Sequence, residues 1–587
     1  MDILNTPNPL ARLFPYLLTY RNKLLLGLLF VLLTNLFNVL GPLLIGSAID
    51  RLKSDFSSAQ LVSYGLLIIL MAAGRGLFLF MVRQTIIVVS RDCEQDIRND
   101  LYQHIQRLST RYYKTRSTGD ILARNTNDLN AIRSFLGPGI MYSANTLATF
   151  LFIIPIMAYV NWELTLVALL PLPVMSYMVF RMGKSIHHQY THIQSHYSSL
   201  TTRVQENLSG IRVVKAYVRE AWEIMTFTRL NRTYMLKNLR LVRYQALFYS
   251  LMSLLIGLSV VLVVWYGGSL VIAGKLTLGE MTQFVIFVGM LIWPMIALGW
   301  VINIIQQASA SQKRINEILD EVPEVRDTPQ TDPEIQSVKG FLTFKSVSFG
   351  YQPDRPVLKD ISFSVTPGQV LAVTGETGSG KSTLVNLVMR LFDPDSGTIL
   401  MDGRPLREIP LKVLRKHIGY VPQDTFLFSD TIANNIGFGV ESAGEEEIRL
   451  VADLASIREN IEDFPQRYDT FVGERGITLS GGQKQRTAIA RALLRKPSVL
   501  ILDDSLSAVD TQTEDLILNR LKEHAESRLT IIVSHRISAI RNATHILVLS
   551  GGEVVEQGTH SELLAANGLY AATWEKQKLE DELKAIT

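Results

Sequence analysis

The stretch "VLAVTGETGSGKSTLV", residues 370–385, decides how the C-terminal half of this chain folds. An apolar run leads into Gly375, four residues separate it from Gly380-Lys381-Ser382, and a helical pattern follows. In this spacing, glycine backbone N–H groups surround a phosphate at the positive end of a helix, with Lys on the outer phosphates and Ser on Mg²⁺. The stretch therefore predicts an α/β domain with a phosphate-binding P-loop.

A second apolar run, "SVLILDDSLSAVD" at residues 498–510, ends in two aspartates. Residues 499–502 predict a strand that is buried on both faces of a parallel sheet. A carboxylate at the end of such a strand is typical of Mg²⁺ sites, and Asp503 fits that role. At the position of Asp504 many nucleotide-driven motors carry Glu, whose longer side chain reaches the attacking water. Asp504 therefore raises the question of whether this site hydrolyses.

Composition places the rest of the chain in a membrane. The 587 residues exceed one hydrophobic core, and the hydrophobic share of 47% is high for a soluble protein. Cys93 is the only cysteine, which excludes an internal disulfide. The net charge of +4 is better explained by membrane topology than by nucleic acid, so no nucleic-acid partner is expected.

Six hydrophobic windows predict six membrane spans. They cover residues 24–49, 61–89, 137–160, 163–182, 244–273 and 277–306, each near or above the roughly 20 residues that cross a bilayer. Lys and Arg are concentrated between spans two and three and between spans four and five. The positive-inside tendency then predicts that both connections, both termini and the C-terminal domain are cytoplasmic.

The predicted domain organisation has four parts. Residues 1–22 are expected to form an amphipathic elbow at the membrane surface, although they could also be the start of the first span. Residues 23–319 contain the six spans, and their two cytoplasmic connections keep helical periodicity, which predicts helices that continue beyond the bilayer. Residues 320–340, rich in Pro, Asp, Gln and Thr, are a linker to the domain at 341–587.

The motif "LSGGQKQR", residues 479–486, identifies a family. Together with Tyr351 in "FGYQ", Gln423 in "GYVPQDTFLFSDTIANNI", "SAVD" at 507–510 and His535 in "IIVSHR", it resembles ATP-binding cassette (ABC) transporters over essentially the whole chain. Six spans fused to one cassette resemble a type IV exporter half-transporter. "STGDILARNTNDL" and "ENLSGIRVVKAYVREAWE" resemble the intracellular loops whose coupling helices dock on the cassettes.

The resemblance assigns roles to individual residues. Tyr351 would stack on adenine, and the P-loop would bind the phosphates of ATP through Gly375, Glu376, Thr377, Gly378, Ser379, Gly380, Lys381, Ser382 and Thr383. Mg²⁺ would be held by Ser382, Gln423 and Asp503. Catalysis would fall to Asp504, Gln423 and His535. In this family two cassettes close head-to-tail, so Ser480, Gly481, Gly482 and Gln483 would contact the ATP of the opposite subunit, and a second half-transporter is an obligatory partner.

The short side chain of Asp504 leaves three functional hypotheses. Loss of one methylene retracts the carboxylate, and misplacement by about 1 Å costs on the order of 100-fold in rate. The chain could be a subunit of a heterodimeric bacterial inner-membrane exporter of the MdlA type for drugs, lipids or peptides, contributing a degenerate site of low ATP-hydrolysing activity. It could be a homodimeric lipid flippase-like pump that uses Asp504 slowly, or a regulatory ATP-binding subunit. Retention of His535 departs from the strongly degenerate pattern.

Three further features have open interpretations. Arg75 in the second span is costly in hydrocarbon, so it either binds substrate or anchors a helix. His188, His192 and His196 recur at i, i+4 and i+8, where a solvated helix face is favoured over a Zn²⁺ or Ni²⁺ site. Aromatic and Met side chains around span six could line an apolar pocket or pack against helices or lipid; they are Phe284, Phe287, Met290, Trp293 and Trp300.

Overall fold

The computed structural model of the chain describes residues 8–52, 57–352, 354–523 and 528–586. It divides into two compact units. The first combines Met1–Arg107 with Arg116–Glu321, and the second combines Leu108–Thr115 with Val322–Thr587. The first seven residues of the predicted elbow and the last residue of the predicted cassette lie outside the described residues.

Six helices of the first unit are long and apolar enough to cross a membrane, which confirms the predicted spans. They run over Arg21–Arg51, Ser58–Arg107, Thr118–Val160, Trp162–Ser209, Glu220–Ile272 and Leu278–Leu319. The fifth has 53 residues, about 80 Å of helix, whereas a hydrocarbon core is roughly 30 Å thick. The helices therefore continue well beyond a bilayer, as their periodicity predicts.

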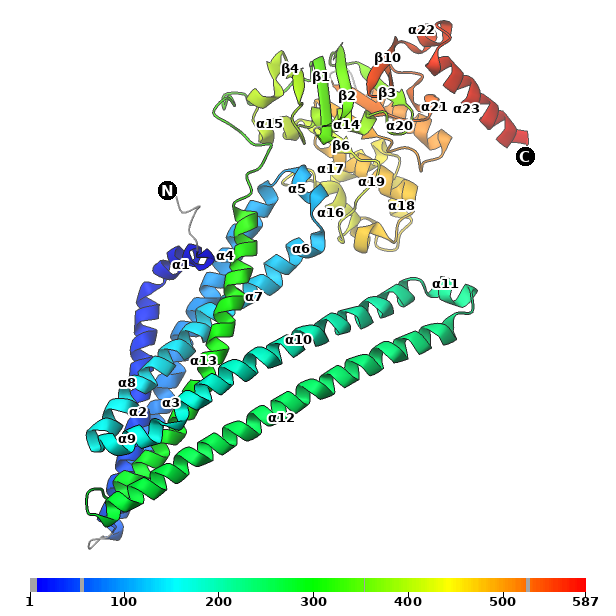
Figure 1. Ribbon diagram of the computed structural model, residues 1–587. Helices are drawn as coiled ribbons and strands as arrows, with labels where there is room; N and C mark the ends of the chain where they lie inside the picture. Colours follow the sequence, from blue (N-terminus) through cyan, green and yellow to red (C-terminus); the bar gives the residue numbers. More distant parts are fainter. Residues whose placement is uncertain (1–7, 53–56, 353, 524–527, 587) are drawn as a thin grey trace. The chain divides into compact units, whose positions relative to one another are not determined.

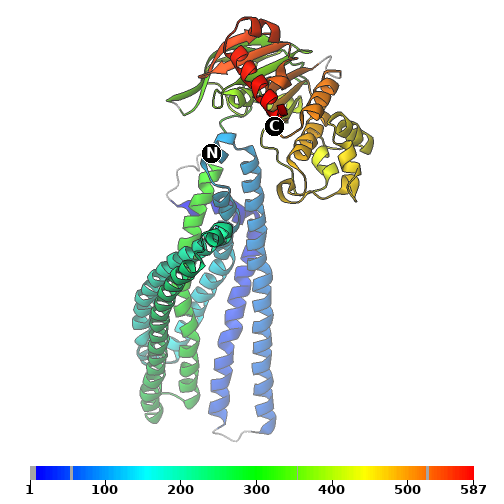
Figure 2. The same cartoon turned by 90° about the vertical axis from the view of Figure 1, so that its right-hand side faces the viewer.

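These spans consist of consecutive helical elements (Figure 1). The helices are α2 (Arg21–Arg51), α3 (Ser58–Val82), α4 (Val88–Arg107), α6 (Thr118–Ala123), α7 (Leu129–Ser134), α8 (Ile140–Val160), α9 (Trp162–Leu169), α10 (Pro171–Ser209), α12 (Glu220–Ile272) and α13 (Leu278–Leu319). Three π-helical turns join them: η2 (Arg83–Ile87), η3 (Arg124–Asp128) and η4 (Phe135–Gly139). The long helices α10 and α12 pack side by side, and α11 (Ile211–Ala216) turns the chain at their tip (Figure 2).

The elbow begins at a capped turn and is held along α4. Asn8 Oδ1 accepts from the backbone N–H of Leu10 at 3.1 Å, which starts η1 (Pro9–Leu13) and then α1 (Phe14–Thr19). Three side chains then contact aspartates spaced four residues apart on one face of α4. These contacts are Tyr16–Asp100 (2.6 Å), Tyr20–Asp96 (2.9 Å) and Lys23–Asp92 (3.1 Å).

Two sheets form the second unit. The larger has the strand order β10-β9-β3-β8-β7-β6, and the smaller, antiparallel one has the order β2-β1-β4-β5. The strands are β1 (Leu342–Gln352), β2 (Arg355–Val365), β3 (Val370–Gly375), β4 (Ser396–Met401), β5 (Arg404–Pro405), β6 (Ile418–Val421), β7 (Val499–Asp503), β8 (Leu529–Val533), β9 (His545–Ser550) and β10 (Glu553–Gly558). Strand β7 is buried throughout and pairs in parallel with β6 and β8, which confirms the strand predicted before the two aspartates.

Helices cover these sheets and complete the α/β domain. They are α5 (Thr110–Thr115), α14 (Lys381–Val388), α15 (Leu411–Lys416), α16 (Ile432–Gly437), α17 (Glu445–Leu454), α18 (Arg458–Glu462), α19 (Gly481–Leu494), α20 (Thr511–Glu523), α21 (Ile537–Ile540), α22 (His560–Ala565) and α23 (Leu569–Ile586). Short 3₁₀ turns are η5 (Leu406–Glu408), η6 (Arg467–Asp469) and η7 (Glu474–Gly476). Residues 321–340, most of the predicted linker, form neither helix nor strand.

Candidate nucleotide-binding site

The loop between β3 and α14 has positive φ angles at three glycines, Gly375, Gly378 and Gly380, and at two of them an added Cβ would also clash. Gly375 has φ 143° and Gly380 has φ 102°, both outside the range that L side chains prefer. A Cβ on Gly375 would lie 2.1 Å from the Leu549 carbonyl oxygen, and one on Gly380 would lie 2.6 Å from Leu358 Cδ2. The loop therefore wraps tightly in front of the first turn of α14, as the sequence motif predicts.

Lys381 is a buried cation at the start of α14. Its side chain is 6% exposed, and Nζ donates to the carbonyl oxygens of Gly375 at 2.9 Å and Glu376 at 2.8 Å. Burial lowers the pKa of Lys381, while Asp504 and Asp503 oppose that shift. Beside it the buried Ser379 Oγ has no hydrogen-bond partner among the described residues. A phosphate oxygen would satisfy both groups, so this loop fits the phosphates of a nucleotide.

Two oxygen ligands meet below the loop. Ser382 Oγ donates to Asp503 Oδ1 at 3.1 Å, and the Asp503 side chain is buried at the end of β7. Burial raises the pKa of Asp503, and the Ser382 hydrogen bond and Lys381 counteract it. Mg²⁺ prefers hard oxygen ligands and keeps several waters, so a hydroxyl and a carboxylate beside the phosphate loop suit it. The pair fits the predicted metal site.

Asp504 and Gln423 also come together. Gln423 Nε2 donates to Asp504 Oδ2 at 3.2 Å. Asp504 has φ 48°, a conformation that costs free energy for a residue other than glycine and is concentrated at functional sites. Its backbone N–H donates to the Val533 carbonyl at 2.8 Å, which fixes the turn after β7. The carboxylate is thus held beside the metal ligands by backbone geometry.

His535 follows β8 and faces the same charges. It is half-buried, and burial followed by the charge of Lys381 lowers its pKa. The ordinary value for histidine is about 6.5, so His535 is neutral at pH 7. Gln577 Nε2 donates to the His535 carbonyl oxygen at 2.6 Å and fixes the backbone.

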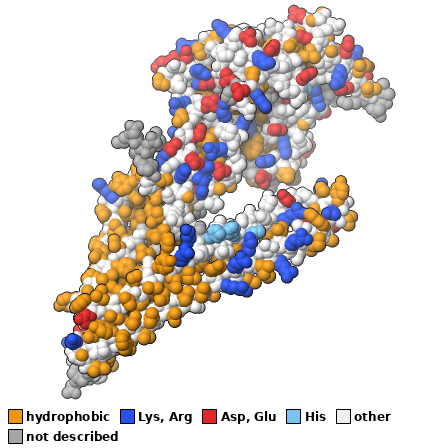
Figure 3. Space-filling view, in the orientation of Figure 1, with side chains coloured by type: hydrophobic (Ala, Val, Ile, Leu, Met, Phe, Trp, Pro, Cys, Tyr) orange, Lys and Arg blue, Asp and Glu red, His pale blue; other side chains and the backbone are white. Residues whose placement is uncertain are grey.

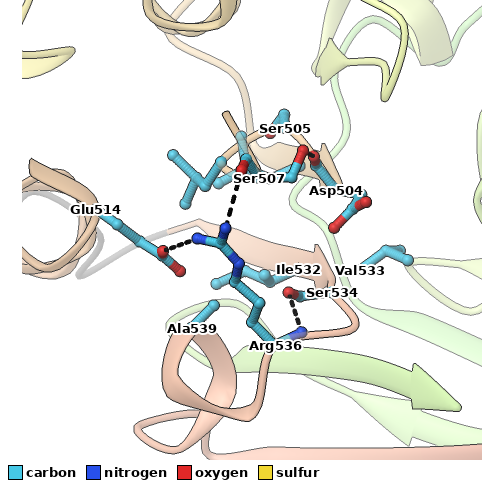
Figure 4. A pocket seen from close by; sticks show the side chains of 11 residues that line it. Asp504, Ser505, Ser507, Glu514, Ile532, Val533, Ser534, Arg536 and Ala539 are labelled. Atoms are coloured by element: carbon cyan, nitrogen blue, oxygen red, sulfur yellow. Dashed lines mark hydrogen bonds and ion pairs between the residues drawn. The ribbon is translucent and has the colours of Figure 1, made fainter. Parts of the chain in front are cut away.

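Arg536 links this turn to the segment after Asp504, a contact that sequence reasoning missed (Figure 4). Its Nη2 donates to the Ser507 carbonyl oxygen at 3.0 Å, and its Nη1 donates to Glu514 Oε2 at 3.4 Å. Glu514 is 2% exposed, and burial raises its pKa. Arg536 ends the motif "IIVSHR", but Glu514 belongs to no recognisable motif, so only the fold reveals the pair.

Tyr351 presents a fixed ring beside the loop. It packs edge-on against Phe349 and Phe392 at centroid distances of 5.1 and 5.3 Å, and its hydroxyl lies 3.2 Å from Thr383 Oγ1. Lys114 Nζ of α5 lies 4.2 Å from the ring centroid. The family resemblance places the first coupling helix within residues 117–129. The segment that packs within the second unit is instead residues 108–115, which lie just before that range.

The signature motif forms a separate half-site at the start of α19. Ser480 Oγ accepts from the Gln483 backbone N–H at 3.3 Å, and Gln483 Oε1 accepts from the Ser480 N–H at 2.9 Å. Gly481 and Gly482 approach Ala508 closely, with an added Cβ at 3.4 Å from its Cβ and 2.9 Å from its carbonyl oxygen. Among the described residues, no hydrogen bond or ion pair joins this motif to the phosphate loop. One chain therefore presents two half-sites.

The remaining predicted residues lie in the first unit. Phe284 and Phe287 are 1% exposed within the helix core and Met290 packs against that core, so the pocket interpretation is wrong for the two phenylalanines. Trp300 packs on Tyr142 at 5.0 Å, and Trp293 lines a cavity together with Arg75.

The histidine row lies on α10, where histidine side chains gather in one patch (Figure 3). The rings of His188 and His192 lie 4.6 Å apart. Over the part of the chain that the structure describes, no group of three or more His, Cys, Asp or Glu is arranged to hold a metal.

Known proteins share this architecture. The family profile described as "ABC transporter transmembrane region" matches residues 24–295, and the one described as "ABC transporter" matches residues 358–507. The probable multidrug resistance ABC transporter ATP-binding/permease protein YheI of Bacillus subtilis is 38% identical and covers 94% of this chain and 95% of its own. The multidrug resistance-like ATP-binding protein MdlA of Escherichia coli is 38% identical, with 92% of each chain covered.

A solved structure agrees over the same length. A bacterial Atm1-family ABC exporter with ATP bound has a TM-score of 0.80 and 30% identity, covering 95% of this chain and 98% of that one. A membrane domain with six spanning helices, a cassette with the P-loop and the signature motif, and full-length relatives together show that this chain belongs to the ABC transporter family and has the ABC exporter fold.

Proposed function

We propose that this chain is one subunit of a heterodimeric ABC exporter that uses ATP to move hydrophobic or amphipathic compounds, such as drugs, lipids or peptides, by alternating access. The multidrug names of two full-length relatives support this substrate range. The distribution of Lys and Arg supports a bacterial inner membrane location with both termini and the cassette in the cytoplasm.

The site residues divide into binding and catalytic roles. Tyr351 stacks on adenine, the loop at residues 375–383 binds the phosphates, and Ser382, Asp503 and Gln423 hold Mg²⁺. Bound Mg²⁺ neutralises charge that develops on the phosphates during transfer. Asp504 and Gln423 are placed to orient water only for slow hydrolysis at this degenerate site, and neutral His535 contributes a hydrogen bond to the terminal phosphate. The signature residues 480–483 act on the ATP of the partner.

The observation that best supports a heterodimer is that the chain combines the short carboxylate of Asp504 with an intact signature motif. Asp504 directly follows β7, where the family resemblance implies a hydrolytic carboxylate, and its shorter side chain accepts a hydrogen bond from Gln423 Nε2 at 3.2 Å. The capped N-terminus of α19, by contrast, is complete for binding a phosphate of a partner. This chain therefore retains ATP at its own P-loop and activates hydrolysis at a site built on a different chain.

A symmetric homodimer is the second candidate, and it also has a specific observation in its favour. Gln423, Asp504 and neutral His535 are all in place, so a slow hydrolytic site on this chain is chemically possible. In that arrangement two copies would hydrolyse equally. If the chain is instead a regulatory subunit that binds ATP without turnover, neither the homodimer nor the mixed pair would hydrolyse ATP.

The deciding experiment is purification of this chain alone and with a candidate partner that has Glu at the position of Asp504. We expect stable assembly and drug-stimulated ATPase activity only for the mixed pair. Equal specific activity of the homodimer would contradict the heterodimer, and absence of hydrolysis in every combination would favour the regulatory role.

A further inference from the structure

A cavity of about 220 Å³ opens among α2, α3, α8 and α13 in the membrane domain. It lies within the first unit. The polar and charged residues that line it are Asn35, Asn38, Arg75, Arg83 and Asn145 together with Thr34 and Tyr142, and its apolar lining includes Trp293. Neither arginine forms an ion pair with any residue that the structure describes. Two cations therefore face a cavity in the hydrophobic part of the protein without an anionic partner.

Both arginines are exposed in the isolated chain, but an unpaired charge within a membrane span is costly, so a bound anion would stabilise them. Both residues belong to the span Ser58–Arg107 and are eight positions apart, which places them on one face at an axial separation of about 12 Å. Ionised side chains in spans pair with one another or mark substrate pathways. Arg83 also begins the π-helical turn η2, and such turns are frequent at functional sites.

Hydrogen bonds order the polar side chains that α2 and α8 contribute to the cavity wall. Asn35 Nδ2 donates to Asn145 Oδ1 at 2.9 Å, and Asn35 Oδ1 accepts from Thr149 Oγ1 at 2.7 Å. These bonds fix the amide of Asn145 so that its own nitrogen remains available as a donor. Asn38, one turn from Asn35 on α2, adds a second side-chain amide at the cavity.

The cavity lining also includes apolar side chains. Trp293 on α13 is 56% exposed, and Leu79 lies on α3 between the two arginines. An inorganic ion would leave this apolar surface in contact with water, whereas an attached hydrocarbon would cover it. A cluster of cationic donors beside apolar side chains suits a ligand that has both an anionic group and a hydrocarbon chain.

We infer that this cavity binds the acidic head group, a phosphate or a carboxylate, of an amphipathic substrate. The planar guanidinium groups of Arg75 and Arg83 can each pair with two oxygens of a carboxylate or a phosphate, and the amides of Asn38 and Asn145 complete the donor set. The inference rests on the proposed export function and narrows it: the preferred cargo is an anionic amphiphile, and cationic drugs are disfavoured.

The test is ligand binding to the full-length transporter, assembled with its partner in neutral phosphatidylcholine nanodiscs. Radiolabelled dodecyl phosphate is the probe, and empty nanodiscs correct for partitioning. Laurate, dodecyltrimethylammonium and inorganic phosphate are the competitors. Arg75→Gln/Arg83→Gln is the test variant, Arg75→Lys/Arg83→Lys is the charge-conserving variant, and Lys275→Gln, outside the cavity, is the control.

We expect dodecyl phosphate to be displaced by laurate, and at least about tenfold less well by dodecyltrimethylammonium. Removal of both arginines should weaken binding at least about tenfold, because each charge-assisted hydrogen bond contributes on the order of tenfold or more in affinity. The Lys pair should bind with intermediate affinity, and Lys275→Gln should bind like the wild type. Inorganic phosphate should not compete at millimolar concentration.

Three results would overturn the inference: unchanged binding by Arg75→Gln/Arg83→Gln, equal displacement by the cationic amphiphile, or full competition by inorganic phosphate, which would indicate a simple anion site. Retained Mg²⁺-ATP binding by each variant shows that it has folded. Arginine-dependent binding without any transport would refute the export function and leave the site standing, whereas transport that is independent of the arginines would refute the site alone.

Discussion

At the residue scale, we propose that the positive charge of Lys381 attracts the phosphates of the nucleotide. Its ammonium is desolvated and bonded to two neutral carbonyls, so no carboxylate contact has to be broken when phosphate arrives. Lys381→Ala removes that charge and should abolish nucleotide binding, measured with a fluorescent ATP analogue on the assembled transporter loaded only at this chain's site. Lys359→Ala, a surface change, should leave binding intact. Unchanged nucleotide labelling of Lys381→Ala would refute the P-loop assignment.

We expect the affinity of this site for Mg²⁺ to depend on pH through the carboxylate of Asp503. Its pKa is raised by burial, so protonation begins at a higher pH than for an ordinary aspartate and competes with the metal. The Mg²⁺ concentration for half-maximal ATP binding should therefore rise as the pH falls from 8 to 5, after correction for protonation of ATP. Asp469→Asn should leave the pH dependence unchanged.

The variant that tests this pH dependence is Asp503→Asn, whose side chain has no titratable carboxyl group. We expect it to need high Mg²⁺ at every pH, so that its curve is flat where the wild type slopes. A wild-type pH dependence in Asp503→Asn would show that Asp503 is not the metal ligand.

Sequence reasoning works at this scale wherever a motif fixes the spacing. Gly375, Lys381, Ser382 and Asp503 could be assigned because the P-loop and a buried strand determine where they lie. The contact of Lys114 with Tyr351 could not be predicted, because a cation near an aromatic ring more than 200 positions away leaves no local pattern. The same reason explains why the Arg536–Glu514 pair was missed.

At the scale of elements, the tip of the α10–α12 hairpin exposes large apolar side chains, and we propose that it contacts another surface. Tyr217 and Val218 are 75% and 80% exposed beside α11. Trp222, in contrast, lies under the guanidinium groups of Arg203 and Arg219, at 5.2 and 4.9 Å from the ring. Glu223 also receives hydrogen bonds from Arg203 and Asn207, and these lower its pKa. The tip is thus a rigid turn that exposes apolar side chains.

We expect Tyr217→Ala to reduce transport strongly while ATP binding stays intact, because the change removes an exposed contact and leaves the turn in place. Trp222→Ala should also reduce transport, but through loosening of the tip, which limited proteolysis at Arg219 would report. Transport assays in vesicles alongside nucleotide binding separate the two effects. A double alanine variant with wild-type transport would remove this tip from the mechanism.

The helices themselves were predictable because apolar windows and periodicity determine spans. The sequence did not reveal the π-helical turns within these helices or which face of each helix packs against its neighbours. Three π-helical turns interrupt the long helices without a Gly or Pro signal at Arg83 or Arg124. The elbow is held by the aspartates on α4, and Phe284 and Phe287 pack in the core, both of which depend on helix rotation. Rotation follows from packing between helices, which one sequence does not encode locally.

For the whole molecule, the central claim is a division of labour between two different chains. This chain contributes a P-loop site with a short Asp504 and an intact signature motif at α19. We propose that a partner completes both sites, because the family resemblance implies two cassettes that close head-to-tail around two ATP molecules. Loss of Asp504 should then matter little, and damage to the signature motif should matter greatly.

Gly481 offers a well-controlled comparison for that claim. An added Cβ would make ordinary contact with Ala508 at 3.4 Å, so Gly481→Ala should keep most activity. Gly481→Asp introduces a negative charge where the partner's ATP phosphate binds, and it should lower hydrolysis on the order of 100-fold or more. An acidic residue in the first turn of a helix does not destabilise that helix, so the loss reports on the site.

The most direct measurement is the ATPase rate of the assembled transporter carrying Asp504→Ala. The account predicts that most of the activity remains, because the partner's carboxylate performs the chemistry, and that Asp504→Glu adds activity at this chain's own site by restoring the missing methylene. Should Asp504→Ala extinguish hydrolysis as thoroughly as Gly481→Asp, Asp504 is a working catalytic carboxylate, and the transporter is a symmetric pump.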